Sequence, residues 1–332
     1  MKAHITAVTH YVPPDVFDNH WFASFLETSD EWIRERTGIV ERRFQREGAT
    51  SDMIVPAAQE ALEQRNMTPK EVDCIIVCTV TPDQFFPSTA ANVQRKLGAS
   101  NAWGFDLNAA CSGFLYGLWV AAKLVESCGA RNVLLCGADK MSSITNFEDR
   151  STCVLFGDGA GVVLLEPSDN DSYGILDAII KMDGDGGRYL YMPAGGSLRP
   201  PSFDTVANKE HYVHQDGQTV FKAAVVGMAD VSAAIMERNH LEPNDIAWLV
   251  PHQANLRIID ATRRRMGLPE EKVMVNIDRY GNTTAATIPI CLSELYRGGK
   301  LKVGDNLILA SFGAGYTWGS IWLRWSLPQA LE

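Results

Sequence analysis

The 332-residue sequence has no long apolar stretch that is free of charges. Its first fifteen residues lack the apolar run of a secretion signal, and no window of 18 or more apolar residues without charge occurs later. We therefore expect a chain that is neither secreted nor membrane-spanning. A formal net charge of −10 also lacks the basic excess that nucleic-acid phosphates require, which excludes a general nucleic-acid role.

The seven cysteines contain no paired CxxC motif of the kind that holds a metal. They form an odd set, and five lie in apolar runs such as DCIIVC and NVLLCG. We expect reduced, mostly buried thiols in a reducing compartment, which predicts a cytoplasmic protein.

An internal repeat is the main organisational signal in this chain. The matched segments are 57–78 with 231–252, 96–114 with 265–288, and 131–139 with 304–313. The first pair has a constant offset of 174 and is typical of a helix, a proline turn and an apolar strand. Alternating helices and apolar strands predict parallel sheets that are covered by helices.

These patterns predict an α/β chain of two pseudo-twofold related halves, with mixed, mainly parallel sheets sandwiched by helices. The segment PSDNDSYG, near 167–175, interrupts the pattern with turn-forming residues. We therefore expect the halves to span 1–172 and 173–332. One doubly wound domain whose halves agree by chance is the alternative, but three successive matches argue against it.

Cys111 is the candidate nucleophile. It follows FDLNAA and precedes SGFLYGLWVAAKLVES, a segment with only two charged residues that predicts a helix buried on almost every side. A thiol at a helix N-terminus lies near unpaired N–H groups and the positive end of the helix dipole, so we expect the thiolate to be favoured. The other six cysteines are interpreted as inert packing.

His252 and Asn282 are the candidate partners of Cys111. His252 follows the strand IAWLVP, and residues at the C-terminal ends of strands face the ligand crevice in α/β sheets. Asn282 precedes the helix that repeats the one after Cys111, so the pseudo-twofold brings the two helix starts together. Gly313, in the glycine-rich SFGAGYTWG, permits close backbone approach and could complete an oxyanion hole.

These segments resemble the β-ketoacyl-acyl-carrier-protein synthase III family of the thiolase superfamily. The resemblance runs from TSDEWIRERTGIVERR through DRSTCVLFGDGAG to GAGYTWG, and AACSGF, PHQAN and GNT carry the three candidate residues. It implies that an acyl-CoA primer acylates Cys111 and condenses with malonyl-acyl carrier protein to start fatty acid synthesis. His252 and Asn282 would stabilise the enolate formed by decarboxylation, so we expect no metal or redox cofactor.

Further contacts are implied by the same resemblance. Trp32 would stack on the adenine of coenzyme A, and Phe86 would cross the interface of a homodimer to line the acyl pocket. The remaining predicted substrate contacts are Thr28, Arg36, Arg150 and Asn255. Gln215 and Tyr316 depart from the residues usual in the family, which leaves the preferred acyl chain undetermined.

An acidic chain needs a local basic surface to bind an acidic carrier protein. The segment ANLRIIDATRRRMG supplies Arg257, Arg264 and Arg265, and family position adds Lys222. The alternative for this segment is a solvated helix face.

Other functions use the same three residues. Polyketide initiation and head-to-head joining of fatty acyl chains are the nearest, and a cysteine hydrolase is a more distant one. A non-catalytic carrier-binding scaffold would be expected to have lost Cys111.

Overall fold

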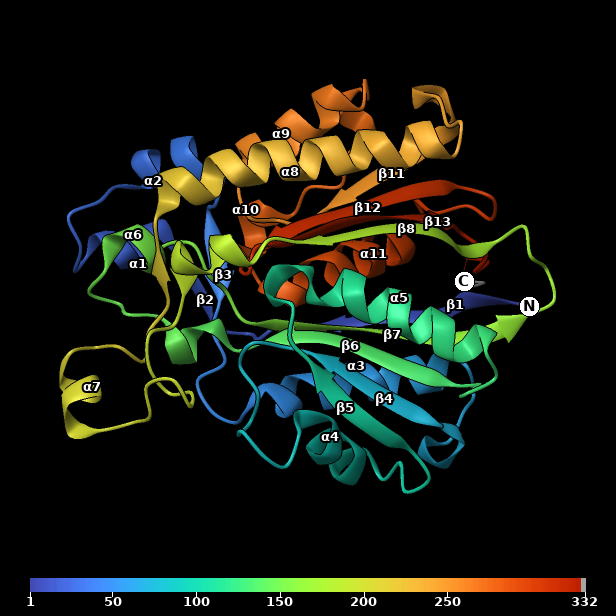
Figure 1. Cartoon of the computed structure of the whole chain (residues 1–332), viewed down its shortest axis with the longest axis horizontal. Helices are drawn as coiled ribbons and strands as arrows, with labels where there is room; N and C mark the ends of the chain where they lie inside the picture. Colours follow the sequence, from blue (N-terminus) through green and yellow to red (C-terminus); the bar gives the residue numbers. More distant parts are fainter. Residues whose placement is uncertain (330–332) are drawn as a thin grey trace.

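Two β-sheets and three layers of helices alternate in the computed structural model, which describes residues 1–329 (Figure 1). The first sheet consists, in spatial order, of β1 (Lys2–Tyr11), β7 (Gly159–Ser168), β6 (Val133–Asp139), β4 (Cys74–Cys78) and β5 (Trp103–Leu107). β4 is parallel to β5 and β6, whereas β7 is antiparallel to β6 and β1. All strands of this sheet except β7 therefore point in one direction.

The second sheet repeats this arrangement. Its strands, in spatial order, are β8 (Gly174–Met182), β13 (Thr317–Arg324), β12 (Asn306–Gly313) and β11 (Ile246–Pro251). β11 and β12 are parallel, and β13 is antiparallel to both of its neighbours. The predicted α/β class with mixed, mainly parallel sheets is confirmed.

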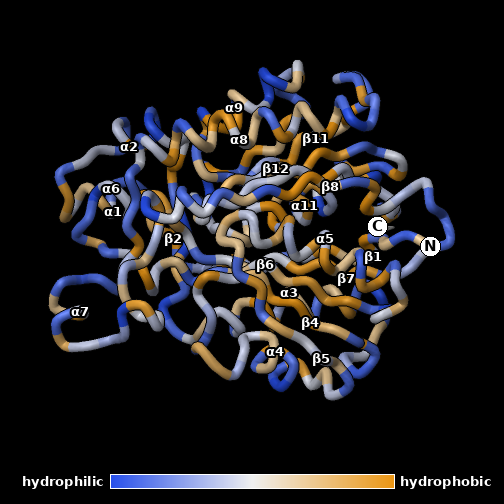
Figure 2. The backbone as a smooth tube through the Cα atoms, in the orientation of Figure 1, coloured by the Kyte–Doolittle hydropathy of each residue, from blue (hydrophilic) through white to orange (hydrophobic). Residues whose placement is uncertain are grey.

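Helices separate and cover the two sheets. The central layer consists of α5 (Gly113–Glu126) and α11 (Thr287–Arg297), and the outer layers of α3 (Thr50–Gln64) with α4 (Thr89–Leu97) and of α8 (Gly217–Arg238) with α9 (Leu256–Arg265). Because both faces of each sheet are covered, β4 reads as the unbroken apolar run CIIVC, in which every residue is buried. Figure 2 shows the same distribution, with hydrophobic residues concentrated in the sheets and the central helices.

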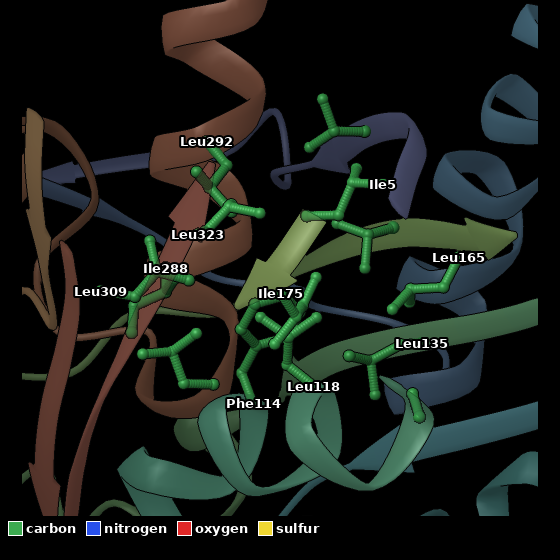
Figure 3. Close-up of a cluster of buried hydrophobic side chains, with 14 of the residues drawn as sticks. Ile5, Phe114, Leu118, Leu135, Leu165, Ile175, Ile288, Leu292, Leu309 and Leu323 are labelled. Atoms are coloured by element: carbon green, nitrogen blue, oxygen red, sulfur yellow. The ribbon is translucent and has the colours of Figure 1, made fainter. Parts of the chain in front are cut away.

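The largest core lies between the sheets. Phe114 and Leu118 from α5 meet Ile288 and Leu292 from α11, and side chains of both sheets close the cluster (Figure 3). Each fully buried side chain of this size stabilises the fold by about 1.5–3 kcal/mol. A helix that contacts sheets on two sides must be apolar nearly all round, which explains the composition of α5.

Shorter elements form the remainder of the described chain. They are β2 (Val16–Asp18), α1 (Asn19–Ala23), α2 (Asp30–Thr37), β3 (Glu41–Arg43), α6 (Arg150–Cys153), β9 (Leu190–Tyr191), α7 (Phe203–Ala207), β10 (His214–Gln215) and α10 (Ile277–Tyr280), with short 3₁₀ turns between several of them.

The repeat predicted from sequence is visible in the topology. The order β1, β7, β6, β4 in the first sheet corresponds to β8, β13, β12, β11 in the second. The proline turns η1 (Pro69–Glu71) and η5 (Pro243–Asp245) preserve the offset of 174. β8 begins just after the predicted seam, which supports our proposal that the halves span 1–172 and 173–332.

The helix α8 is the one helix in the described residues that is long and apolar enough to cross a membrane by length and composition alone. Its inner face, which includes Val220, Ala224 and Met228, is buried in the hydrophobic cluster formed with the second sheet. Packing on that sheet therefore accounts for the apolar residues of this face.

The cysteines are all free, and six of the seven are buried. Cys128, at the end of α5, is exposed, so its interpretation as a packing residue is wrong. It lies in the turn that ends α5, where its backbone φ of 60° places it in the left-handed region.

Candidate active site

A cavity of about 1130 Å³ lies where α5 and α11 begin. Cys111, His252, Asn282 and Gly313 all line it, so the structure brings together the four residues predicted to act in chemistry. Much of the remaining wall is apolar. It includes Val80, Met141, Ile144, Leu155, Phe156, Val213 and Phe312.

Cys111 lies in the 3₁₀ turn η2 (Ala110–Ser112) that leads into α5. Side chains of the β12–β13 hairpin fix this turn: the Ser311 hydroxyl donates to the Cys111 carbonyl at 2.8 Å, and the Thr317 hydroxyl donates to the Ala109 carbonyl at 2.8 Å. The nucleophile is therefore positioned by the C-terminal half of the chain, although it belongs to the N-terminal half.

The ionisation predicted for Cys111 is opposed by its surroundings. Burial raises the pKa of the thiol to about 12, the Asp139 carboxylate adds to the rise, and a backbone N–H only partly offsets it. Burial therefore opposes the ionisation that the helix start is expected to favour. The helix start acts instead on negative charge that develops during attack.

Gly313 ends β12 directly against the nucleophile. A Cβ atom at this position would lie 2.7 Å from the Cys111 nitrogen and 3.0 Å from the Cys111 Cβ. Contacts this short require a residue without a side chain. The backbones of Gly313 and Cys111 are thus close enough to face one substrate oxygen together.

His252 follows β11 and is buried in the cavity wall. Its Nδ1 lies 2.7 Å from the Thr287 hydroxyl, whereas Nε2 is buried without a hydrogen-bond partner among the described residues. Burial lowers the pKa of His252 to about 3, so the imidazole is neutral at physiological pH. A neutral imidazole with one unpartnered nitrogen is suited to bind a substrate atom.

Asn282 is held by its backbone and by its own amide oxygen. Its N–H donates to the Leu155 carbonyl at 2.9 Å, and its carbonyl accepts from the Gly157 N–H at 3.0 Å. The side-chain Oδ1 accepts from the Thr284 N–H at 2.9 Å. Because the Asn282 Oδ1 already accepts a hydrogen bond from a backbone N–H, the Nδ2 group is the part of the amide that can bind a ligand in the cavity.

The turns before α5 and α11 have the same backbone conformation. Ala110 and Thr284, 174 residues apart, have φ angles of 49° and 50°, and the helices begin three residues later at Gly113 and Thr287. A positive φ is uncommon for residues other than glycine, so its recurrence at equivalent positions marks one repeated turn.

This correspondence refines the relation predicted between the two turns. Ala285, not Asn282, occupies the position equivalent to Cys111, and Asn282 corresponds to Asn108. The Asn108 Oδ1 accepts a hydrogen bond from the Ala110 N–H, just as the Asn282 Oδ1 accepts one from the Thr284 N–H. Asn108 also lines the cavity. The offset of 174 could have identified Asn108 from the sequence, as the counterpart of Asn282.

Asp139 is a second residue that sequence reasoning missed. It is fully buried at the end of β6, and its Oδ1 accepts from the Thr79 hydroxyl at 2.9 Å and the Val80 N–H at 2.8 Å. Its Oδ2 accepts from the Thr284 hydroxyl and from the Ala285 N–H. This carboxyl group therefore ties the turn after Asn282 to the first sheet, and a polar residue in the run NVLLCGAD was the available signal.

Trp32 and two arginines form one side of the entrance. The Arg36 and Arg150 guanidinium carbons lie 4.8 Å and 5.0 Å from the Trp32 ring centre. Trp32, Arg36 and Asn255 line the cavity, and the Asn255 amide donates to the Arg36 carbonyl at 2.8 Å. Arg150 reaches Trp32 from outside the lining.

The other residues predicted to contact substrate lie outside the cavity wall. Thr28 has a buried hydroxyl without a partner among the described residues, and Phe86 is 85% exposed. Gln215 lines the cavity, whereas Tyr316 packs against Phe312 with 4.9 Å between ring centres. Neither Thr28, Phe86 nor Tyr316 is part of the cavity lining.

Two further cations line the cavity. Lys222 and Arg257 both line the cavity, and neither forms an ion pair within residues 1–329. The Arg257 guanidinium stacks on Phe221 at 4.9 Å from the ring centre. This stacking leaves the charge available to a partner.

Arg264 and Arg265 are placed differently. Arg264 pairs with Asp260 at 2.7 Å, and Arg265 lies 3.2 Å from Asp230. They follow Arg257 by about two turns of α9, roughly 11 Å along the helix axis. The structure therefore does not bring them to the cavity mouth.

A cysteine nucleophile, an unpartnered imidazole nitrogen and a carboxamide in one apolar cavity, at the junction of two repeated α/β halves, define a condensing acyltransferase of the thiolase fold. The family model described as 3-oxoacyl-[acyl-carrier-protein (ACP)] synthase III matches residues 105–184, and the one for the C-terminal part of that family matches residues 236–325. The chain belongs to the β-ketoacyl-[acyl-carrier-protein] synthase III family.

Full-length relatives and solved structures agree with this assignment. The beta-ketoacyl-[acyl-carrier-protein] synthase III of Chlorobaculum tepidum is 56% identical over 98% of this chain and 100% of its own. The crystal structure of 3-oxoacyl-[acyl-carrier-protein] synthase III from Aquifex aeolicus has a TM-score of 0.90 and 41% identity, covering 97% of this chain and 100% of that one. The corresponding Thermus thermophilus structure has a TM-score of 0.90 and 42% identity, covering 98% and 100%.

Proposed function

We propose that this enzyme condenses an acyl-CoA primer with malonyl-acyl carrier protein in two half-reactions, through an acyl group on Cys111. One observation carries the proposal: a buried cysteine, the unpartnered Nε2 of His252 and the Asn282 amide line the same cavity. The names of the relatives include the acyl carrier protein, and fatty acid synthesis is the process to which we assign the reaction.

In the first half-reaction the Cys111 sulfur bonds to the acyl carbonyl of acyl-CoA. The tetrahedral oxyanion accepts hydrogen bonds from the N–H groups of Cys111 and Gly313. The bond from the carbonyl to the coenzyme A sulfur then breaks, and that sulfur receives the proton that the Cys111 thiol has lost. The acyl group remains on the enzyme as a thioester.

In the second half-reaction malonyl thioester loses CO2. The electron pair of the broken carbon–carbon bond forms an enolate, whose oxygen lies between the His252 Nε2–H and the Asn282 Nδ2–H. The enolate carbon attacks the acyl carbonyl and expels the Cys111 sulfur as a thiolate, which takes up a proton from solvent. The product is a β-ketoacyl thioester on the carrier protein.

A cysteine hydrolase is the alternative from another class of chemistry. It would use His252 as a base toward Cys111 and admit water to the acyl-enzyme. The largely apolar wall of the cavity supports condensation instead, because it suits an acyl chain. Polyketide initiation and head-to-head condensation are not favoured, since the relatives that are 56% identical to this chain are synthases III.

Intact-protein mass spectrometry after incubation with a mixture of acyl-CoAs tests the proposal directly. We expect one acyl group per chain, on Cys111, which is discharged by malonyl-acyl carrier protein with formation of a β-ketoacyl product. Release of free acid in place of this product would favour the hydrolase. The mass of the retained group also identifies the preferred primer.

The entrance residues support binding of two acidic ligands. We assign Trp32, Arg36 and Arg150, with Thr28 and Asn255, to coenzyme A, whose adenine and phosphates suit an aromatic ring flanked by cations. We assign Lys222 and Arg257 to the carrier protein. Arg264 and Arg265 are left out of this assignment because acidic neighbours already neutralise them.

Reversing the charge at Arg257 tests the carrier-protein surface. We expect Arg257→Glu to raise the Michaelis constant for malonyl-acyl carrier protein about three- to tenfold and to flatten its salt dependence, because the lost contact is electrostatic. Acylation by acyl-CoA should change little. Steady-state kinetics with both donors at two ionic strengths measure this.

Arg264→Glu is the matched control, since it makes the same charge change on the same helix away from the mouth. It should leave the carrier-protein Michaelis constant within about twofold of the wild-type value. Equal effects of both substitutions would mean that net charge, and not a docking surface near Arg257, controls association.

We also propose a homodimer that forms through β5. This edge strand pairs only with β4 among the described strands, and its Trp103 is 48% exposed and stacks on Phe105 at 6.2 Å. An edge strand with an exposed aromatic ring is suited to pair with a second copy. Phe86, also exposed, would then reach the acyl pocket of the partner.

A lysine on this edge should separate the subunits. Trp103→Lys places a charge in the proposed interface, and we expect it to weaken dimerisation about 30-fold or more, as sedimentation equilibrium would show. Val226→Lys changes an exposed residue of α8 and serves as the control. A dimer that survives Trp103→Lys unchanged would place the interface elsewhere.

The cytoplasm is the proposed location. Within residues 1–329 every cysteine is free, in agreement with a reducing compartment.

A further inference from the structure

The contact between His252 and Thr287 determines how the imidazole can act. Thr287 is the first residue of α11 and is buried, and its hydroxyl oxygen lies 2.7 Å from the His252 Nδ1. The other ring nitrogen, Nε2, is the buried atom without a partner. The hydrogen bond at Nδ1 therefore decides which nitrogen carries the ring proton.

The Thr287 hydroxyl has two possible acceptors and only one hydrogen. If it donates to Nδ1, the ring proton lies on Nε2 and points to the substrate. If it donates to the Thr284 carbonyl, 3.2 Å away, it accepts a hydrogen bond from Nδ1–H, and Nε2 is left with a lone pair. The first arrangement makes His252 a donor and the second makes it a base.

Two features favour the first arrangement. The contact to Nδ1 is the shorter of the two. The Thr284 carbonyl already accepts from the Thr287 backbone N–H, so it does not need the hydroxyl. In either arrangement burial keeps the ring neutral, as its lowered pKa indicates, so His252 carries a single ring proton.

We infer that Thr287 is a positioning residue, whose hydroxyl donates to the His252 Nδ1 and thereby keeps the ring proton on Nε2. The inference rests on the proposed function, in which Nε2–H and the Asn282 amide together bind the enolate oxygen. It also explains why His252 does not serve as the base for Cys111, because its cavity-facing nitrogen already bears a proton.

Nitrogen NMR of histidine-labelled enzyme tests the position of the proton. The His252 signals are assigned by their loss in His252→Ala. In the wild-type protein we expect Nε2 to have the shift of a proton-bearing nitrogen and Nδ1 that of a hydrogen-bond acceptor. A proton on Nδ1 would overturn the inference, whatever the activity of the enzyme.

Kinetics of two variants supply the second readout. Thr287→Val keeps the shape of the side chain but removes the hydroxyl, and we expect decarboxylation to fall on the order of tenfold while Cys111 acylation stays within about twofold. Thr287→Ser retains the hydroxyl and should restore both the rate and the wild-type nitrogen shifts. A structural defect alone would lower both half-reactions together.

The results separate this inference from the proposed function. Wild-type decarboxylation by His252→Ala would contradict the proposed role of His252. Loss of decarboxylation in His252→Ala, with wild-type rates and nitrogen shifts in Thr287→Val, would contradict only the role of Thr287. If Thr287→Val fails to fold, the wild-type spectrum and Thr287→Ser still decide the question.

Discussion

Cys111→Ala will carry no acyl group after incubation with acyl-CoA and will retain less than about 10⁻³ of the wild-type condensation rate. No other thiol among the described residues lines the cavity, and the turn before α5 places only this side chain against Gly313. Intact-protein mass spectrometry measures the acyl group, and product formation from malonyl-acyl carrier protein measures the rate.

Cys128→Ala is the control for this experiment. Cys128 is the exposed cysteine at the far end of α5, where reactive thioesters could modify it without catalysis. We expect this variant to be acylated and to condense as the wild type does. Acylation of Cys111→Ala that disappears in the double variant would assign that group to uncatalysed reaction at Cys128, whereas stoichiometric acylation that persists in the double variant would disprove the proposed intermediate.

His252→Ala and Asn282→Ala should each slow malonyl decarboxylation by about 10²–10³-fold and affect Cys111 acylation much less. Removing one preorganised donor to an oxyanion typically has an effect of this size. Acylation uses different donors, the N–H groups of Cys111 and Gly313. Release of CO2 from malonyl thioester and single-turnover acylation by acyl-CoA measure the two steps separately.

Asn282→Asp refines the test because it keeps the size of the side chain. Its carboxylate still accepts from the Thr284 N–H but replaces the Nδ2 donor with an oxygen. We expect decarboxylation as slow as in Asn282→Ala, since a negative oxygen would repel the enolate. Equal losses in both half-reactions for the His252 and Asn282 variants would indicate a base-activated site of the hydrolase type.

Much of the fold could be predicted because the signals are local. Strand β4 is an apolar run and α5 is apolar nearly all round, so both elements can be predicted from their own residues. The repeat then supplied long-range information, since it placed Cys111 and Asn282 at the starts of related helices. The order of strands within each sheet needed the structure, because no local pattern specifies a neighbour.

The parts of the site that could not be predicted depend on contacts between distant residues. The helix start at Cys111 suggested a thiolate, but burial by the whole fold has the larger effect on its pKa. Arg265 appeared free in sequence, although its guanidinium lies 3.2 Å from the carboxylate of Asp230 in another helix. Thr287 gave no signal at all, because its partner His252 lies 35 residues earlier in the chain.

The repeated turn before α5 and α11 has an evolutionary consequence. Two copies of one backbone, with matching φ angles at Ala110 and Thr284, hold a sulfur nucleophile in one half and alanine at the same place, Ala285, in the other. Duplication of a single ancestral unit would provide both turns at once, already facing each other across a twofold axis. Amino-acid substitutions alone would then give the two turns different chemical roles, so new chemistries in this scaffold can arise without any change of backbone.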